Sequence, residues 1–153
     1  DKALVPEEEY CLPFGKAAIL REGTDVTLIG TSSMRQVCEK AALLLEQDGI
    51  SAEVIDPRTL VPLDENTILD SVKRTSGAIV VDEGHQNFGT TAEIASRISE
   101  KAFYFLDAPV VRMGAMDVPI PFSPVLEDIT VPTAEGVADK ARKLVAGELI
   151  HVL

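Results

Sequence analysis

Beyond residue 23, apolar residues follow two alternating patterns along the chain. One pattern is a short run rich in β-branched residues, which predicts a strand, and the continuous run Ala78–Val81 is typical of a strand buried on both faces. These runs are Val26–Ile29, Ala52–Ile55, Ala78–Val81 and Val110–Val111. The other pattern is an apolar stripe at helical spacing, which predicts a helix that buries one face. The stripes lie within residues 34–45, 68–72, 94–102 and 137–145.

The regular alternation of predicted strands and helices indicates the architecture. Parallel strands need crossover connections, and the helices of those connections cover both faces of the sheet. We therefore predict an α/β fold, a three-layer α/β/α sandwich around a mostly parallel sheet of about five strands. The chain has 153 residues, which is the length of one domain.

Polar residues stand where the predicted helices begin and end. Two pairs have the capping-box spacing, in which a hydroxyl residue precedes its partner by three positions, and two further residues are predicted single N-caps. These are Ser33 with Gln36, Thr90 with Glu93, Asp64, and Thr133. Gly49 follows the first helical stripe, at the position where helices commonly end in left-handed backbone.

Two segments depart from the alternation of strands and helices. Residues 1–23 begin with a polar, acidic stretch and end in the turn-like sequence Arg21–Gly23, so we predict a linker and lead-in segment there and a folded domain over residues 24–153. Residues 110–130 are rich in proline and predict a long ordered loop over the surface.

Composition and charge limit the classes of partner. Apolar residues make up 46% of the chain and charged residues 25%, which is the ordinary globular range. The net charge of −11 would repel a phosphate backbone, so we predict no nucleic-acid partner and favour a basic protein. No apolar stretch reaches the ~20 residues of a membrane span, so no membrane association is predicted. Cys11 and Cys38 predict two reduced thiols in a cytosolic protein.

The loop Gly84–Thr91 is the strongest candidate for ligand chemistry in the pattern alone. It follows a predicted strand and opens a predicted helix, as a phosphate-binding loop does, but Thr90 stands where the lysine of that motif belongs. Backbone amides at the helix start remain able to hold a small anion, and a small-anion or nucleotide-binding module is therefore kept as an alternative function.

His85 is a candidate general base at the end of a strand. No nucleophile or second base accompanies it, so a hydrogen-bonded loop or interface histidine is the favoured interpretation. His151 lies in the tail and has no predicted role. The neighbouring acids Asp82 and Glu83 are interpreted as solvated rather than metal-binding, and the hydroxyls of Ser32 and Ser33 as caps.

Several blocks, in order along nearly the whole chain, carry a specific family resemblance. They are Val5–Tyr10, Pro13–Ala17, Val54–Asp64, Val80–Gly84, Phe105–Pro109 and Asp117–Phe122. Together they resemble the carboxyl-terminal domain of the beta subunit of thiamine-diphosphate-dependent 2-oxo acid dehydrogenases, and the stretch Met116–Leu126 is most similar to the pyruvate and acetoin branch. Other members of the transketolase superfamily share this fold, but Pro13–Ala17 and Asp117–Phe122 argue against them.

The resemblance implies that the catalytic groups lie outside this chain. In the family, the preceding domain of the beta subunit supplies the glutamate that activates the cofactor and an active-site histidine, and the alpha subunit holds the diphosphate and its magnesium. We therefore expect no catalytic, cofactor-binding or metal-binding residue here, and we expect the chain alone to be inactive. It is expected to begin in the linker that follows the cofactor domain.

The resemblance also implies partners and a location. The expected partners are the alpha subunit, a second beta subunit, and the basic peripheral-subunit-binding domain of the acyltransferase. Asp107 lies in the block where the family presents an acidic residue to that domain, although a cap or loop carboxylate is an equal alternative. An acidic chain with a pI of about 4.5 would attract the basic domain. The expected location is the bacterial cytoplasm, or the mitochondrial matrix in a eukaryote.

Overall fold

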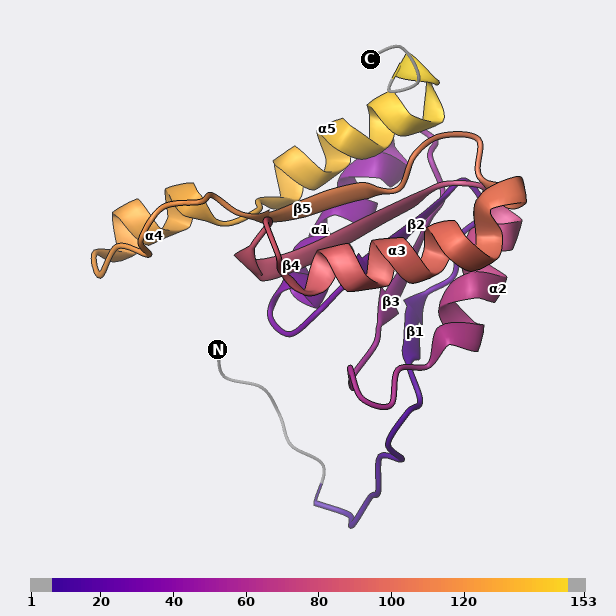
Figure 1. Cartoon of the computed structure of the whole chain (residues 1–153), viewed down its shortest axis with the longest axis horizontal. Helices are drawn as coiled ribbons and strands as arrows, with labels where there is room; N and C mark the ends of the chain where they lie inside the picture. The colour runs from indigo at the N-terminus through magenta and orange to yellow at the C-terminus, as the bar shows by residue number, and fades with distance from the viewer. Residues whose placement is uncertain (1–6, 149–153) are drawn as a thin grey trace.

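The computed structural model describes residues 7–148, which form a five-stranded sheet with helices on both faces (Figure 1). The strands are β1 (Ala18–Arg21), β2 (Val26–Gly30), β3 (Ala52–Asp56), β4 (Ala78–His85) and β5 (Val111–Ala115). Their order across the sheet is β1-β3-β2-β4-β5. The last four strands are parallel, and β1 pairs antiparallel with β3 at one edge. The predicted sheet is confirmed.

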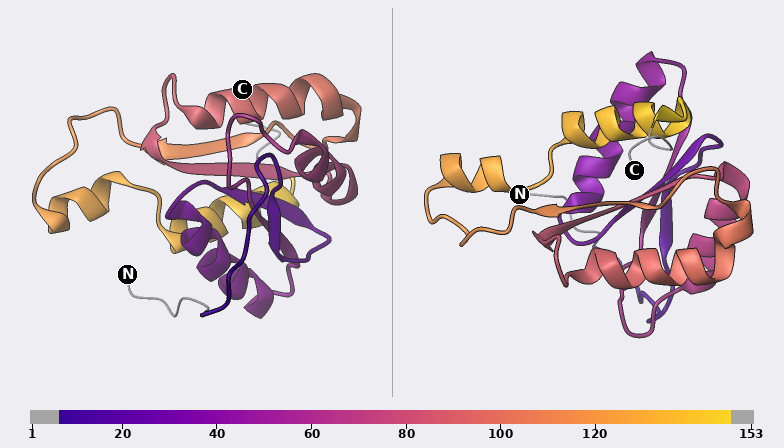
Figure 2. Two further views of the ribbon diagram at one scale, coloured as in Figure 1. Left: turned by 90° about the horizontal axis from the view of Figure 1, so that it is seen from below. Right: turned by 45° about the horizontal axis from the view of Figure 1, so that its top comes forward.

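Helices cover the sheet in two layers, as predicted. α1 (Met34–Gln47) and α5 (Ala134–Val145) pack on one face, and α2 (Glu65–Thr75) and α3 (Thr90–Ala102) pack on the other (Figure 2). The short helix η1 (Phe103–Phe105) follows α3, and α4 (Pro124–Thr130) lies between β5 and α5. The three-layer α/β/α architecture is therefore confirmed.

The central strands are buried on both faces because successive residues point into different layers. Leu28 and Ile79 pack in the core under α1 and α5, whereas Ile29 and Val80 pack in the core under α2 and α3. All four side chains are 0% exposed. Burying a side chain of this size contributes ~1.5–3 kcal/mol, so these contacts fix the strands and thereby the positions of the loops that follow them.

Two of the four predicted N-caps are confirmed. The Asp64 carboxylate accepts a hydrogen bond from the Thr67 amide, and the Thr133 hydroxyl accepts one from the Gly136 amide. The predicted capping boxes at Ser33 and Thr90 are wrong, since neither α1 nor α3 has a side-chain cap. Ser33 already has helical backbone angles, which differ from the extended angles that favour capping. α3 begins at Thr90 itself, with Gly89 at the N-cap position.

Gly49 ends α1 in the predicted conformation. Its φ of +76° lies in the left-handed region, where glycine has no steric penalty, and its amide donates to the Glu46 carbonyl at 3.1 Å.

The predicted lead-in contributes an edge strand to the sheet. β1 falls within residues 1–23, and the segment before it is tied down because the Gly15 amide donates to the Thr59 hydroxyl and the Ala17 amide to the Asp64 carboxylate. The strand has only four residues and none of them is fully buried, so its apolar pattern is weak. The division of the chain at residue 23 stays a prediction, and residues 1–6 lie outside the described part.

The predicted loop over residues 110–130 contains more regular structure than expected. Its first part forms β5, as predicted for the strand at Val110–Val111, and its last part forms the seven-residue helix α4, which was not predicted. Pro124 lies in the first turn of α4, where proline is tolerated. We call Met116–Thr130 the arm. It projects away from the three layers, as the orange segment with α4 shows in both figures (Figures 1 and 2).

Both cysteines are free thiols, as predicted. Cys38 is buried on α1 and Cys11 is exposed before β1. Within residues 7–148, no helix combines the length and the apolar character that crossing a bilayer requires.

Candidate functional site

The carboxyl ends of β2 and β4 bring together the hydroxyl and acidic residues singled out in the sequence. The Thr31 hydroxyl donates to the Asp82 carboxylate, and the Ser32 and Ser33 hydroxyls donate to the Glu83 carboxylate. The other Asp82 oxygen accepts from the Gly84 amide at 2.6 Å. These groups therefore hold the β2–α1 loop against β4, and the serine hydroxyls serve this contact rather than the helix cap predicted for them.

A cleft of about 570 Å³ lies beside this cluster, where the chain leaves β2 for α1 on one face of the sheet and leaves β4 for α3 on the other. Open α/β sheets commonly bind ligands at such a point. Its polar lining comes from Thr31, Ser32, Arg35, Asp56, Arg58 and Asp82. Two arginines and two aspartates line it, so their formal charges balance, and the Arg35 guanidinium lies 4.0 Å from the Asp56 carboxylate. The cleft lining includes neither histidine nor cysteine.

His85 is the last residue of β4, and its Nε2 lies 3.0 Å from the carbonyl oxygen of Val118 in the arm. This is the hydrogen-bonded loop position favoured from the sequence. The Gln86 amide donates to the Ala115 carbonyl, and the Gln86 carbonyl accepts from Arg112. The loop after β4 is therefore bound to β5 and to the base of the arm. Among residues 7–148, no three acidic, histidine or cysteine side chains cluster as metal ligands.

Asp107 lies at the opposite end of the sheet, between η1 and β5. Its amide donates to the carbonyl of Ser76, the residue that ends α2, at 2.9 Å. Its side chain is exposed, and in the part of the chain that the structure describes, no hydrogen bond or ion pair engages its carboxylate. The backbone thus positions this residue and leaves the charge available.

Asp107 lines a mostly apolar groove, whose lining also includes Arg112. The groove has a volume of about 760 Å³ and runs between α3 and β5. Its α3 side is made of small residues, among them Ala95 and Ser99, and its rim carries the exposed rings of Phe103 and Tyr104. An exposed apolar groove beside a free carboxylate suits a partner that offers apolar and basic side chains together.

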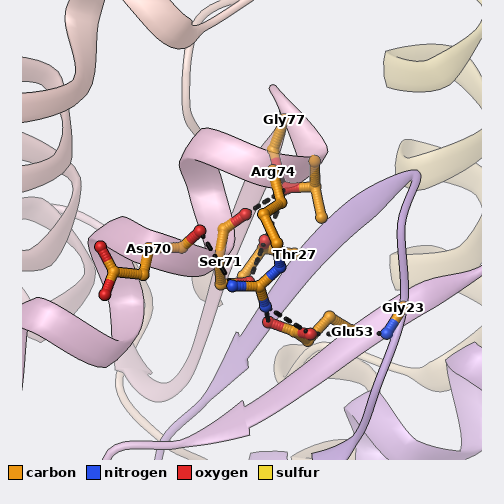
Figure 3. A network of polar contacts seen from close by, with 8 residues as sticks. Gly23, Thr27, Glu53, Asp70, Ser71, Arg74 and Gly77 are labelled. Carbon is orange, nitrogen blue, oxygen red and sulfur yellow. Dashed lines mark hydrogen bonds and ion pairs between the residues drawn. The ribbon is translucent and has the colours of Figure 1, made fainter.

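A buried polar network supports this end of the sheet (Figure 3). Glu53 of β3 is only 2% exposed, and its two carboxylate oxygens lie 2.6 and 2.8 Å from one guanidinium nitrogen of Arg74 on α2. Arg74 also donates to the Asp70 carbonyl, and the Gly23 amide lies 3.5 Å from Glu53. The charge-assisted contact compensates for burial of the carboxylate and ties α2 to β3.

Three hydroxyls extend the network toward Ser76. The Thr27 hydroxyl lies 2.7 Å from those of both Ser71 and Thr75, and Thr75 donates to the Gly77 carbonyl (Figure 3). All three side chains are buried. They fix the end of α2, which carries the carbonyl that holds Asp107.

A second exposed apolar region was not predicted from the sequence. Phe88, in the loop after β4, and Phe122, in the arm, are both fully exposed, and α4 exposes Val125, Leu126 and Ile129. The sequence feature that could have indicated this region is the number of large apolar residues among the prolines of the arm. That pattern shows apolar residues but not which of them a fold leaves uncovered.

Comparison with known proteins gives the same family across most of the chain. The family model described as "Transketolase, C-terminal domain" matches residues 15–137. The pyruvate dehydrogenase E1 component subunit beta of Bacillus subtilis is 46% identical over 140 residues, covering 92% of this chain and 43% of the relative. The acetoin:2,6-dichlorophenolindophenol oxidoreductase subunit beta of the same organism is 43% identical over 143 residues, covering 94% of this chain and 42% of the relative.

Other relatives include mitochondrial beta subunits of pyruvate dehydrogenase, from Dictyostelium discoideum and Arabidopsis thaliana. The chain spans less than half the length of these relatives.

Solved structures agree. A split-gene transketolase, described as an inactive beta4 tetramer, superposes with a TM-score of 0.79 at 27% identity, over 99% of this chain and 47% of that one. A transketolase of Pichia stipitis, with 19% identity and a TM-score of 0.59, covers 87% of this chain and 18% of that one and supports the fold. The chain belongs to the transketolase C-terminal domain family, and its homologues are beta subunits of pyruvate and acetoin dehydrogenases.

Proposed function

We propose that the chain is the carboxyl-terminal assembly domain of the beta subunit of a thiamine-diphosphate-dependent 2-oxo acid dehydrogenase of the pyruvate or acetoin type. The observation that carries the proposal is the surface: the α3–β5 groove, η1 and the arm all expose large apolar side chains on the β5 side of the sheet. Surfaces of this kind serve association rather than chemistry. The relatives favour this function over a free-standing anion or nucleotide module.

The described residues do not fit thiamine diphosphate with magnesium. In the cleft beside β2 and β4, both oxygens of Asp82 are already engaged, and the guanidinium charges are balanced by carboxylates. No cluster of metal-ligating side chains occurs within residues 7–148. We propose that other parts of the assembled enzyme bind the cofactor and the metal, and that this chain positions the subunits relative to one another.

The test of the assembly role uses three preparations. The 153-residue chain, given thiamine diphosphate, magnesium and pyruvate or acetoin, is expected to show no turnover. The complete beta subunit with its alpha subunit is expected to turn over, and deletion of this domain is expected to abolish assembly as well as activity. Turnover by the chain alone, or a fully assembled enzyme without the domain, would overturn the proposal.

Asp107 is proposed to dock the basic peripheral-subunit-binding domain of the acyltransferase. Support comes from its exposed carboxylate, the mostly apolar groove that it lines, and the net charge of −11. A negative field speeds the approach of a basic partner, and a desolvated ion pair then adds specificity. The remaining proposed partners are the alpha subunit and a second beta subunit. The proposed location is the cytoplasm in a bacterium and the mitochondrial matrix in a eukaryote.

A further inference from the structure

We propose that Phe88 and the exposed apolar residues of the arm form one docking surface for a different subunit, which offers an apolar groove rimmed by lysine or arginine. We call Phe88, Phe122, Val125, Leu126 and Ile129 the arm surface. The inference rests on the proposed function, which includes the alpha subunit among the partners, and it assigns the groove to that subunit. It adds the place of contact and the chemistry of the partner's surface.

The side chains of the arm surface are apolar, and the described chain leaves them exposed to water. Phe88 and Phe122 are fully exposed, and Val125, Leu126 and Ile129 expose more than half of their surface. Most apolar residues of α1, α2, α3 and α5 belong to the two cores or pack against them, whereas none of these five does. Water-exposed apolar residues gathered on one projecting segment mark a contact surface.

The arm is anchored by its own hydrogen bonds. The Met116 amide donates to the Thr130 carbonyl at 2.9 Å, which joins the two ends of the arm. At its base, Asn87 donates to Asp117, and the His85 ring contacts the Val118 carbonyl. A segment held in one conformation before binding loses less conformational entropy when its partner arrives. The anchoring therefore suits a preformed docking element.

Phe88 is held in a conformation that bulky residues rarely adopt. Its φ is +56°, in the left-handed region, and its ring has no burial within the described chain to offset the strain. The loop is fixed on one side by contacts of Gln86 with β5 and on the other by the start of α3. The neighbouring Asn87 contact places Phe88 beside the base of the arm, so both parts can meet one partner.

Charge distinguishes the partner from a second copy of this chain. Residues 113–139 contain no lysine or arginine, and the arm carries Asp117, Glu127 and Asp128. With a net charge of −11, a second copy would bring acidic surfaces together. An apolar groove with a basic rim on another subunit would instead bury the apolar residues and neutralise the acids.

The test measures binding of the full-length beta subunit to its alpha subunit. Phe88→Ser, Phe122→Ser and Ile129→Ser each change an exposed side chain, so the fold is expected to persist, which circular dichroism and melting temperature check. Each is expected to raise the Kd for the alpha subunit at least about tenfold, as central apolar contacts do. Leu43→Ser on α1, where the side chain is 54% exposed, is the matched control and is expected to leave Kd within about twofold.

A second experiment tests the role of charge in binding. Glu127→Lys combined with Asp128→Lys is expected to slow association with the alpha subunit and to weaken its dependence on salt, because the steering charge is reversed. Glu22→Lys, an exposed acidic position before β2, is the control and is expected to leave the association rate near that of the wild type.

The outcomes separate the two proposals. If the wild-type beta subunit fails to bind the alpha subunit, the proposed function fails. If it binds and the three serine variants bind equally well, the docking surface is wrong while the proposed function stands. Light scattering of the 153-residue chain gives the third outcome. A dimer that Phe122→Ser converts to a monomer would make the occupant a second copy and overturn the inferred basic partner.

Discussion

The amide of Asp107 donates to the carbonyl of Ser76 at 2.9 Å, and this contact joins the end of α2 to the loop before β5. Ser76 ends α2 with a φ of +57°, in the left-handed region, and this backbone conformation sets the direction of its carbonyl. A hydrogen bond between the hydroxyls of Thr27 on β2 and Thr75 holds that helix end on the sheet. Because the contact uses the Asp107 backbone, changes to the side chain test its charge without removing its anchor.

Asp107→Ala is expected to weaken binding of the basic docking domain by about 1–3 kcal/mol, the range for a charged group whose partner is desolvated in the complex. Calorimetry at low salt is the appropriate measurement, because screening reduces any contribution from an exposed pair. Glu22→Ala, at an exposed acidic position outside the groove lining, should bind as the wild type does. Equal affinities for Asp107→Ala and the wild type at low salt would remove Asp107 from the docking site.

The lowered pKa of Asp64 predicts that the stability of the fold depends on pH. Its side chain is 6% exposed, and burial alone would raise the carboxyl pKa, but hydrogen bonds from the Ala17 amide and from Thr67 outweigh burial and hold the pKa below 3.8. A lowered folded pKa means that the carboxylate stabilises the fold above the unfolded value, and that this stability is lost as pH falls through the folded pKa.

Melting temperatures between about pH 2 and pH 6 test this linkage, since the interval spans the ordinary carboxyl pKa. The wild type should lose stability toward the acidic end, whereas Asp64→Asn should be less stable near neutrality and depend less on pH. At neutral pH, Asp64→Ala should cost about 1–2 kcal/mol, as loss of an N-cap does. An identical pH profile for wild type and Asp64→Asn would contradict the assignment.

The elements that could be predicted from the sequence are those decided by local pattern. Runs such as Ala78–Val81 are continuous because β4 is covered on both faces, and the helical stripes match the buried faces of α1 and α5. β1 escaped prediction because a half-exposed edge strand of four residues has little periodicity.

Features that depend on distant residues could not be predicted from local pattern. Ser33 has the spacing of a cap, but its hydroxyl donates to Glu83, which is 50 positions away in the chain. The position of Asp107 beside Ser76 depends likewise on the meeting of α2 and the loop before β5. The proposed role of Asp107 rests on family resemblance, whereas the exposure of Phe88 and Phe122 could be seen only from the fold.

The two cysteines should differ sharply in reactivity. Burial, with a smaller effect of the neighbouring Glu39 carboxylate, raises the pKa of the Cys38 thiol to about 12, so almost none of it is thiolate near neutral pH. Cys11 is exposed and accessible to reagent. At pH 8, an aromatic disulfide reagent should modify Cys11 rapidly and Cys38 only after unfolding in denaturant. Peptide mass mapping identifies the residue, and rapid modification of Cys38 in the native chain would show that α1 opens.

Arg74→Ala tests how much the ion pair between Arg74 and the buried Glu53 carboxylate contributes to the stability of the fold. Glu53 is 2% exposed and Arg74 is half-exposed, so removing the arginine leaves a buried charge without its main donor, whereas removing both groups leaves neither charge. We expect Arg74→Ala to lower the free energy of unfolding by about 1–3 kcal/mol. Combining it with Glu53→Gln should cost less than the sum of the two single changes, because the pair acts as a unit. Urea denaturation of the four proteins gives the coupling directly, with Lys73→Ala on the same helix as the control for loss of an exposed cation. Additive effects would mean that the short contact between Glu53 and Arg74 contributes nothing to the anchoring of α2 on β3.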